Sequence, residues 1–461
     1  MVRVFSHWFA SSTLLQIAFD AILLFLSVML AAALLNPRDV LRIEAIVPDA
    51  LLFATTMVIL NSIVGLYHRN PGRTMAQTTA RIVLSVMLAV PVAWAIFSIL
   101  PPADGWYDAL RVAVPVAFVT LVAIRGLATL SGLAPVLVRR TLVLGTGAEA
   151  AAVEKSLSEL GPGVRFVGFL PARNGDADTR VHGQKVLAGT TDLIEAARRY
   201  RLDEIVVAVR ERRGGVLPLR ELLDCKLMGI RVLDLSSYYE RAVGQIRLDT
   251  LHPSWLIFGD GFRQGLLRAF VKRMFDITTA LMLLALAIPV MLAAGVLIVL
   301  ESGFPVVYRQ ERVGQGGRLF SLIKFRSMRT DAEVDGKPRW AVRNDDRITA
   351  VGRQLRKLRI DELPQLLNVL KGDMSLVGPR PERPYFVDQL AREIPFYAVR
   401  HCVKPGITGW AQVRYHYGAS LDDAAQKLQY DLFYVKNHTL FLDIVVLFET
   451  VGVVLSGEGA H

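Results

Sequence analysis

Hydrophobic residues gather in four long stretches in the N-terminal part of the chain. The stretches cover residues 14–35, 50–66, 82–100 and 112–130. Each is close to the length that a helix needs to cross a bilayer. The loop after the second stretch contains three arginines and no acid, whereas the loop after the third is acidic and aromatic. Because positive loops stay in the cytoplasm, we predict four transmembrane helices within residues 1–135, with both the N-terminus and the remaining chain cytoplasmic. A signal peptide is the alternative for the first stretch.

Beyond residue 140 the pattern changes to short β-rich runs that alternate with helical ones. The runs typical of strands are 141–144, 164–170, 204–209 and 230–235, and those typical of helices are 148–160, 191–200 and 219–228. This alternation is typical of doubly wound α/β folds. We therefore predict a Rossmann-like α/β domain with a mostly parallel sheet over residues 138–250.

The turn after the first predicted strand, Gly145 to Ala150, matches a glycine-rich phosphate cradle in its alanine-ended form. The acid that would bind a ribose is missing after the next strand, where Pro171 follows Leu170. Two interpretations therefore stay open at this turn. It packs a helix on a strand without a ligand, or it binds a nucleotide.

A fifth apolar segment, residues 277–300, has no charge and is long enough to cross a membrane. Pro289 divides it into halves of about 18 Å, which are too short for a ~30 Å hydrocarbon core. Basic residues flank both ends. We therefore predict a re-entrant helix hairpin over residues 272–304 that enters and leaves on the cytoplasmic side. The alternative, a kinked span, would place residues 314–461 outside.

Composition and charge agree with a membrane protein that also has soluble domains. Hydrophobic residues make up 52% of the 461 residues, and the formal net charge is +11. Residues 309–359 contain 14 Lys/Arg against 6 Asp/Glu. Directly after an apolar segment, such a cluster favours anionic lipid and phosphorylated substrates over nucleic acid. The two cysteines, Cys225 and Cys402, have no zinc-ligand spacing, and we expect both to be buried thiols.

An adjacent pair of acids, Asp361 and Glu362, follows a run of four cations. We predict that Asp361 caps a helix ending at Gly372, and that the helix dipole and the cations keep both carboxylates ionised. One carboxylate could then attack phosphorus while the other holds Mg²⁺. A capping aspartate beside a solvated glutamate is the alternative. Prolines on both sides of Arg380 restrict its backbone, which suits phosphate binding.

These features occur in an order that resembles the monotopic bacterial sugar transferases, which initiate exopolysaccharide, capsule or O-antigen synthesis. The matching motifs are Lys272–Asp276, Gln310–Gly314, Lys324–Met328, Asp345–Thr349, Asp361–Gln365, Gly378–Pro381 and Lys404–Gly409. The resemblance covers residues 268–461, an α-rich catalytic domain, with 251–267 as a linker. The whole architecture is similar to that of the large polyprenyl-phosphate hexose-1-phosphate transferases, also called phosphoglycosyl transferases. Ile288 stands where the family commonly has serine, and residues 410–420 look like the exopolysaccharide subgroup.

The resemblance implies a reaction and a set of site residues. A UDP-sugar, glucose or galactose, would donate hexose 1-phosphate to undecaprenyl phosphate through an aspartyl-phosphosugar intermediate, with release of UMP. The implied roles are nucleophile and metal ligand for Asp361, Mg²⁺ partner for Glu362, and phosphate or substrate binding for Arg356, Arg380, Lys324, Arg326 and Arg312. The enzyme would sit on inner-membrane lipid of a bacterium with its catalytic and α/β domains cytoplasmic, and a homodimer is left open.

Two other classes of function are weighed against this one. A membrane-anchored NAD-dependent sugar-nucleotide dehydratase or epimerase needs a Tyr-x-x-x-Lys pair, but Tyr238 and Tyr239 have no lysine four residues later. A non-enzymatic membrane scaffold that senses a nucleotide would leave the arrangement of Asp361, Glu362 and Arg380 unexplained.

Overall fold

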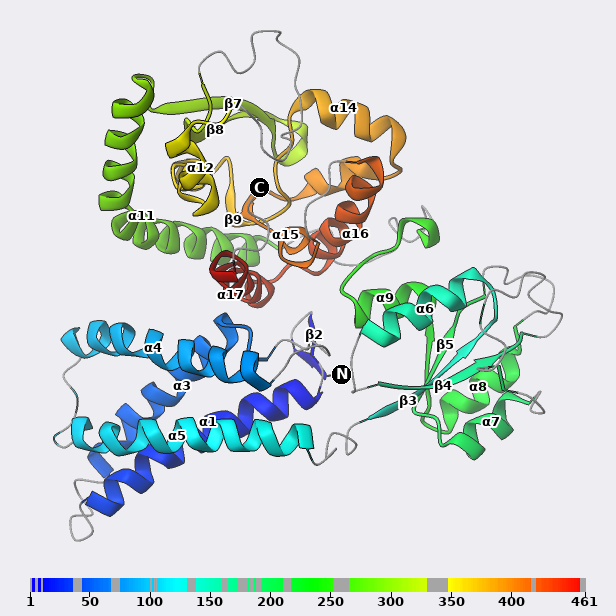
Figure 1. Cartoon of the computed structure of the whole chain (residues 1–461). Helices are drawn as coiled ribbons and strands as arrows, with labels where there is room; N and C mark the ends of the chain where they lie inside the picture. The colour runs from blue at the N-terminus through cyan, green and yellow to red at the C-terminus, as the bar shows by residue number, and fades with distance from the viewer. Residues whose placement is uncertain are drawn as a thin grey trace. The chain divides into compact units, whose positions relative to one another are not determined.

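The computed structural model describes most of the chain. The described residues are 2–4, 7–9, 11–35, 44–67, 75–99, 102, 104, 106–130, 138–159, 164–172, 181, 186–187, 192–209, 217–251, 265–329, 347–415 and 420–456. Along the chain, the main division between two compact units falls between Val243 and Gly244. Figure 1 shows the helices and strands of both units.

Four helices form over the four N-terminal apolar stretches. They are α1 (Ser11–Leu35), α3 (Val47–Ile63), α4 (Met75–Ile99) and α5 (Trp106–Leu130), preceded by the paired strands β1 (Val2–Val4) and β2 (His7–Phe9). Helices α1 and α4 each pack against both α3 and α5. Within the described residues, three helices are long and apolar enough to cross a membrane: α1, α5 and the later α11. The apolar parts of α3 and α4 are shorter, so four crossings stay a prediction.

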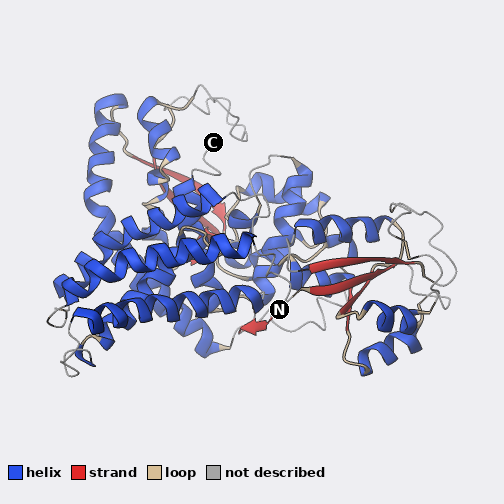
Figure 2. Ribbon diagram, turned by 60° about the horizontal axis from the view of Figure 1, so that its bottom comes forward, coloured by secondary structure: helices blue, strands red, loops and turns tan. Residues whose placement is uncertain are grey.

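The predicted α/β domain is confirmed, with a four-stranded parallel sheet in the order β4-β3-β5-β6. The strands are β3 (Arg139–Leu144), β4 (Val164–Leu170), β5 (Glu204–Val207) and β6 (Arg231–Asp234), and the helices are α6 (Ala148–Glu159), α7 (Leu193–Tyr200), α8 (Leu219–Leu227) and α9 (Leu235–Ala242). Figures 1 and 2 show helices on both faces of this sheet. Alternate residues of β3 enter two separate cores, since Val143 packs with α6 and α9 while Leu142 packs with α7 and α8.

Packing requires the first glycine of the glycine-rich turn, and nucleotide binding there stays a prediction. Gly145 has φ +119°, and a Cβ there would lie 2.7 Å from the carbonyl oxygen of Ala208. Only glycine fits both constraints. Tyr238 and Tyr239 are buried in the α6–α9 core, and the Tyr238 hydroxyl lies 2.8 Å from Ser156 Oγ. The tyrosines that a dehydratase would need are therefore interior packing residues.

The C-terminal limit of the α/β domain differs from the prediction. Residues 244–250, including the short 3₁₀ helix Leu248–Thr250, belong to the second unit instead. The Gly244 carbonyl accepts a hydrogen bond from Trp410 Nε1 at 2.8 Å, and Ile246 N donates to the Gln429 carbonyl at 3.0 Å. The boundary is therefore set by contacts with residues of the same chain that lie about 170 positions further along the sequence. Most of the predicted linker 251–267 lies outside the described residues.

The proline-split segment forms one helix, α11 (Leu266–Ser302), rather than two separate helices. Pro289 lies inside it, and Figure 1 shows a pronounced bend along the helix. A proline cannot donate to the preceding turn, so the predicted kink is expected, while the neighbouring hydrogen bonds keep the helix continuous. Large apolar side chains on both sides of Pro289, such as Leu286 and Leu292, are exposed. Re-entry into a membrane stays a prediction.

The rest of the second unit is α-rich, as predicted. Its strands are β7 (Val307–Val313) and β8 (Leu319–Phe325), which are antiparallel, and β9 (Ser375–Val377) and β10 (Gly406–Thr408), which are parallel. Its remaining helices are η4 (Gln315–Gly317), α12 (Ala350–Lys357), η5 (Ile360–Glu362), α13 (Gln365–Lys371), α14 (Pro384–Glu393), η6 (Tyr397–Cys402), α15 (Trp410–Arg414), α16 (Leu421–Asn437) and α17 (Leu440–Ser456).

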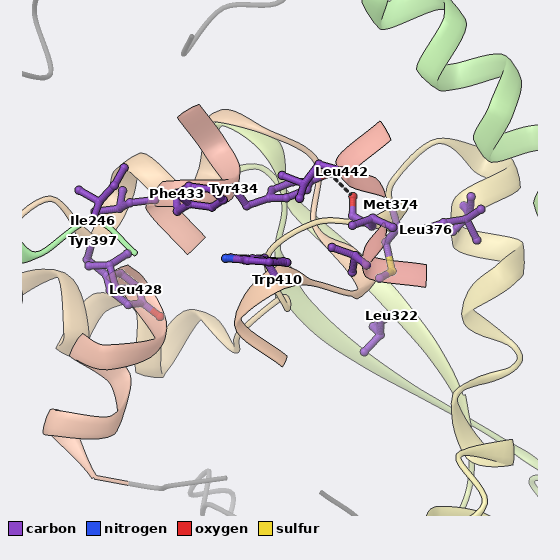
Figure 3. Packing of buried hydrophobic residues seen from close by; sticks show 14 of the residues in the cluster. Ile246, Leu322, Met374, Leu376, Tyr397, Trp410, Leu428, Phe433, Tyr434 and Leu442 are labelled. Carbon is purple, nitrogen blue, oxygen red and sulfur yellow. Dashed lines mark hydrogen bonds between the residues drawn. The ribbon is translucent and has the colours of Figure 1, made fainter. Parts of the chain in front are cut away.

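The main core of the second unit surrounds Trp410. Trp410 stacks on Phe433 with ring centroids 5.6 Å apart, and Figure 3 shows them with Tyr434, Met374 and other members of the cluster. Together with the other members of the cluster these residues join β9, α15 and α16, so the aromatic residues of α15 and α16 that Figure 3 labels are core residues. Of the two cysteines, one is buried, but Cys402 is exposed because it ends η6 at the surface, which corrects that expectation.

Two motifs of the sequence meet where β9 and β10 pair. Gly378 N donates to the Thr408 carbonyl at 2.9 Å, and Gly406 N donates to the Pro379 carbonyl at 3.0 Å. A Cβ on Gly378 would lie 2.3 Å from the carbonyl oxygen of Lys404. The two backbones therefore approach too closely for any side chain, and this crossing fixes the loop that carries Arg380.

We expect Gly378→Ala to destabilise the second unit by about 1–3 kcal/mol, because backbone must move to admit the methyl group. Thermal unfolding of the detergent-solubilised chain measures this change. Gly265→Ala is the matched control, since a Cβ at Gly265 meets nothing within 4 Å. Equal unfolding midpoints for the two variants would contradict the close crossing.

Candidate active site

The two adjacent acids lie in a 3₁₀ turn, and the predicted cap at Asp361 is wrong. Leu363 N donates to the Ile360 carbonyl at 3.2 Å, while the α-helix α13 begins only at Gln365. Arg359 before the turn has a left-handed backbone, φ +57°, so α12 does not continue into the turn. The helix ends at Gly372 as predicted, with φ +98°. The field of the helix dipole therefore has a smaller part at Asp361 than the sequence suggested.

A buried asparagine fixes α13 against the β7–β8 hairpin. Asn368 Oδ1 accepts from Ile323 N at 3.0 Å, and its Nδ2 donates to the Ser321 carbonyl at 2.8 Å. Both contacts lie just before Lys324 on β8. This arrangement explains why Lys324, which is distant in sequence, reaches the acidic pair.

Glu362 is surrounded by cations. Arg380 Nη2 donates to Glu362 Oε1 at 2.7 Å, and Arg380 Nη1 lies 3.5 Å from Oε2. Lys324 Nζ and Arg359 Nη1 lie 3.8 Å and 3.6 Å from Oε1. Burial alone would raise the pKa of Glu362, but Arg380 and then Lys324 outweigh it and hold the pKa well below its usual range. Glu362 is therefore ionised, and the neighbouring cations balance its negative charge.

Asp361 behaves in the opposite way. Its side chain is buried, and in the described part of the chain its Oδ1 has no hydrogen-bond partner. Burial, followed by the adjacent charge of Glu362, raises the pKa of Asp361, although Lys324, Arg356 and Arg380 act in the other direction. The prediction that the surroundings favour ionisation of both carboxylates alike is therefore wrong. The two carboxylates therefore differ: cations balance the charge of Glu362, whereas Asp361 is poorly solvated and has a raised pKa.

Burial also changes the lysine of the site. It lowers the pKa of Lys324 to about 8, and Glu362 only partly opposes the shift. Lys324 is therefore a cation that loses its proton within an accessible pH range, whereas the arginines beside it do not.

The other predicted arginines divide into two groups. Arg356 in α12 contributes a positive field at Asp361, and Arg312 in β7 holds the loop next to Arg380, donating to the Pro381 carbonyl at 2.9 Å. Arg326 instead closes the end of α11, where it donates to the Ser302 and Gly303 carbonyls at 2.9 and 2.6 Å. That contact is structural, and a phosphate role for Arg326 stays a prediction.

Sequence reasoning missed one buried arginine beside this site. Arg400 is buried, and its Nη2 donates to the Arg380 carbonyl at 3.0 Å and lies 2.8 Å from Asp431 Oδ2. With Arg312 on the next carbonyl, two arginines hold consecutive peptide groups of the Arg380 loop. The one signal in the sequence is a charged residue, Asp431, among the mostly apolar residues 428–435.

The assembled site can do phosphoryl chemistry. It joins an unpartnered carboxylate oxygen to several cations, of which Arg380 is held rigidly by its backbone and by Glu362. Fixed cations stabilise charge on a transferring phosphoryl group without reorganising. Residues 416–419, within the segment 410–420 that looks like the exopolysaccharide subgroup, lie outside the described residues.

Known proteins match the same region. A family model described as bacterial sugar transferase matches residues 267–457. The chain is 46% identical over 261 residues to the UDP-N-acetylgalactosamine-undecaprenyl-phosphate N-acetylgalactosaminephosphotransferase of Aeromonas hydrophila, which covers 57% of the chain and 61% of that protein.

Two further relatives have glucose in their names instead of N-acetylgalactosamine. The undecaprenyl-phosphate glucose phosphotransferase of Komagataeibacter xylinus is 33% identical over 329 residues, 68% of the chain and 59% of that protein. The UDP-glucose:undecaprenyl-phosphate glucose-1-phosphate transferase of Caulobacter vibrioides is 43% identical over 193 residues, 41% of the chain and 72% of that protein. The chain thus spans about three fifths of the length of the Aeromonas and Komagataeibacter relatives.

Proposed function

The chain belongs to the bacterial sugar transferase family, and we propose that it transfers a hexose 1-phosphate from a UDP-sugar to undecaprenyl phosphate at the bacterial inner membrane. The observation that carries this proposal is the contrast between the two adjacent carboxylates. Three cations neutralise Glu362, whereas Asp361 keeps a buried oxygen without a partner. A carboxylate that is poorly solvated and not tied up in hydrogen bonds is a competent nucleophile.

The proposed reaction has two displacements at phosphorus. An Asp361 oxygen attacks the sugar-bearing phosphate, a new carboxylate–phosphorus bond forms, and the bond to UMP breaks with its electron pair on UMP. A phosphate oxygen of undecaprenyl phosphate then attacks the same phosphorus and restores the carboxylate. Lys324, Arg356 and Arg380 stabilise the charge that develops in both steps. The product would be the first lipid-linked intermediate of a polysaccharide.

We also propose that Mg²⁺ assists this site. Within the described part of the chain no cluster of three or more metal-binding side chains exists, so these residues alone do not form a metal cage. Asp361, through its open Oδ1, and the adjacent Glu362 would hold Mg²⁺, which commonly takes one or two protein carboxylates together with substrate phosphates and water. When bound, the ion would neutralise charge on the diphosphate.

The contacts of α11 support a re-entrant arrangement. Near its start, Arg273 donates to the Val369 and Leu370 carbonyls at 2.6 and 2.7 Å. Near its end, Glu301 accepts from Val351 N at 3.0 Å. Both ends are tied to one folded unit, which cannot lie on both sides of a bilayer. The bend at Pro289 would then enter the cytoplasmic leaflet and return.

This topology predicts that Cys402 can be labelled only from the cytoplasmic side of the membrane. Because Cys402 is exposed on the catalytic unit, a membrane-impermeant maleimide should leave it unlabelled in spheroplasts and label it once the inner membrane is opened. Cys402→Ser should remove the signal, because the other cysteine, Cys225, is buried. Labelling of intact spheroplasts at Cys402 would place the catalytic unit outside and refute the arrangement.

The pH dependence of kcat/KM should be bell-shaped. The pKa of Asp361 is raised, so the ionised nucleophile accumulates only as pH rises through that value, and activity rises with it. Lys324 has a pKa of about 8, so activity should fall as pH rises beyond about 8 and the positive charge is lost. Lys324→Arg should move the alkaline limb upward while leaving the acid limb in place. An unchanged alkaline limb in that variant would show that another group titrates there.

A donor screen tests the proposed function as a whole. Membranes containing the chain are incubated with undecaprenyl phosphate and UDP-glucose, UDP-galactose or UDP-N-acetylgalactosamine, since relatives named for glucose and N-acetylgalactosamine both match. UMP release and label in the lipid fraction are expected with one donor, and chelation of Mg²⁺ should abolish both. Release of UDP instead of UMP would refute the transfer of a phosphosugar.

A further inference from the structure

A buried polar cluster joins the start of α11 to β9, α16 and α17. Lys272 Nζ lies 3.3 Å from Asp276 Oδ1 and 2.9 Å from Asp443 Oδ2, and it donates to Ser375 Oγ at 2.6 Å. The other oxygen of Asp443, Oδ1, lies 2.6 Å from the Tyr434 hydroxyl. Asp276 and Asp443 are 2% and 1% exposed. Two interior carboxylates therefore share one lysine.

This cluster has an excess negative charge when both aspartates are ionised. Among the described residues, Lys272 is the only cation within ion-pair distance of either carboxylate. Arg268, Arg273 and Lys404 lie further away and form no ion pair with either aspartate in the same part of the chain. Burial lowers the pKa of the neighbouring His438 to about 4, so its ring is uncharged at neutral pH. A buried charge without a matching partner is costly, and one bound proton would remove the excess.

The hydrogen bonds of Tyr434 indicate where this proton lies. The Tyr434 hydroxyl is 2.6 Å from Asp443 Oδ1 and 3.0 Å from the Val377 carbonyl oxygen. A hydroxyl has one hydrogen, so it cannot donate fully to both oxygens. When Asp443 is protonated, its hydroxyl donates to Tyr434, and Tyr434 donates to Val377. Both short contacts are then complete hydrogen bonds.

Asp276 has the contacts of an ionised carboxylate instead. Its Oδ1 accepts from Lys272 Nζ and from Leu376 N, each at 3.3 Å. Burial raises the pKa of Asp443, although Lys272 acts in the other direction. With a proton on Asp443, the charges of Lys272 and Asp276 balance each other.

The cluster holds three consecutive residues of β9. Ser375 Oγ accepts from the lysine, Leu376 N donates to Asp276, and the Val377 carbonyl accepts from the tyrosine. Three positions after Val377, the chain reaches Arg380, whose guanidinium donates to Glu362 at 2.7 Å. The backbone that leads into the Arg380 loop is therefore fixed by this buried network.

We propose that Asp443 holds a proton at neutral pH and is a positioning residue, which fixes the strand before Arg380 through Tyr434 and the Val377 carbonyl. The effect on Arg380 rests on the proposed transfer reaction, whereas the protonation of Asp443 does not. An asparagine at position 443 has the same shape, donates to Tyr434 and accepts from Lys272. Asp443→Asn should therefore replace the protonated acid, but it could not replace an ionised one.

Infrared difference spectra test the protonation without reference to activity. The spectrum of Asp443→Asn is subtracted from that of the wild-type chain, with both full-length proteins in nanodiscs at neutral pH. We expect the variant to lose the carbonyl-stretch band of a protonated carboxylic acid. Asp388→Asn, at an exposed position on α14, should lose carboxylate bands instead. Loss of carboxylate bands in Asp443→Asn would show that Asp443 is ionised and would overturn the proposal.

Turnover tests the positioning. Asp443→Asn should keep kcat for lipid-linked sugar within about twofold of wild type, since the amide makes the same hydrogen bonds. Tyr434→Phe should lower kcat roughly tenfold, the effect of losing one hydrogen bond to Val377. Tyr200→Phe, in the α/β domain, is the matched control and should change nothing.

Two kinetic results would overturn the proposal. One is a tenfold loss of kcat in Asp443→Asn while its unfolding midpoint stays at the wild-type value. The other is an unchanged kcat in Tyr434→Phe. If Tyr434→Phe folds poorly, the infrared spectra and the turnover of Asp443→Asn still decide the question. A wild-type chain that makes no lipid-linked sugar would refute the proposed function and leave the infrared result standing.

Discussion

Asp361→Asn should abolish formation of lipid-linked sugar, with a loss of roughly a thousandfold or more. The amide has nearly the same shape but cannot form the bond to phosphorus. The stability of the variant protein should not fall, because the substitution removes a buried charge that lies beside Glu362. The measurement is transfer of labelled sugar from the UDP-sugar to undecaprenyl phosphate, together with thermal unfolding.

The covalent step can be tested without the acceptor. Wild-type protein incubated with sugar-labelled donor should release one UMP per chain and retain label after denaturation, whereas Asp361→Asn should do neither. Asp388→Asn is the matched control, because Asp388 is an exposed aspartate on α14. If Asp361→Asn still forms lipid-linked sugar, or if the label stays on the protein in that variant, the nucleophile is a different residue.

Arg400→Leu should be the most destabilising single change in the catalytic unit. Arg400 and Asp431 are 6% and 2% exposed, and the substitution leaves the aspartate buried without its partner. Breaking such a pair costs about 3–5 kcal/mol. For a unit of this size the unfolding midpoint should fall by roughly 10 °C. Thermal unfolding in detergent measures it.

A double variant separates stability from positioning. Arg400→Leu with Asp431→Leu replaces the pair by apolar groups, so most of the lost stability should return. Transfer should remain low, because the Arg380 carbonyl has lost the donor that holds it. A kcat that recovers together with stability would show that Arg400 serves the fold alone and does not position Arg380.

Local patterns were sufficient for most elements of the α/β domain. Strand β4 has its predicted limits, and β3, α6 and α8 agree within two residues. Apolar alternation and turn residues depend on near neighbours in the chain, so they can be recognised without the fold. Helix α9 was not predicted, because its polar residues showed no clear boundary after β6.

The acidic pair shows where sequence reasoning ended. Motif order identified Asp361, Glu362 and Arg380, but the cap was wrong, since the left-handed backbone of Arg359 and the 3₁₀ turn are not visible in composition. The cations that decide the two pKa values come from β8, from α12 and from the loop after β9. Their distances to the carboxylates exist only in the folded chain.

By itself, the sequence determined the family, the alternation of strands and helices, the proline in α11 and the identity of the acidic pair, because these depend on residue types in fixed order. The tertiary structure alone decided that Glu362 is neutralised while Asp361 stays unpaired, that Arg400 holds Arg380, and that the chain divides at Val243 and Gly244. Burial and charge depend on distances in space, and contacts between residues far apart in the chain set those distances.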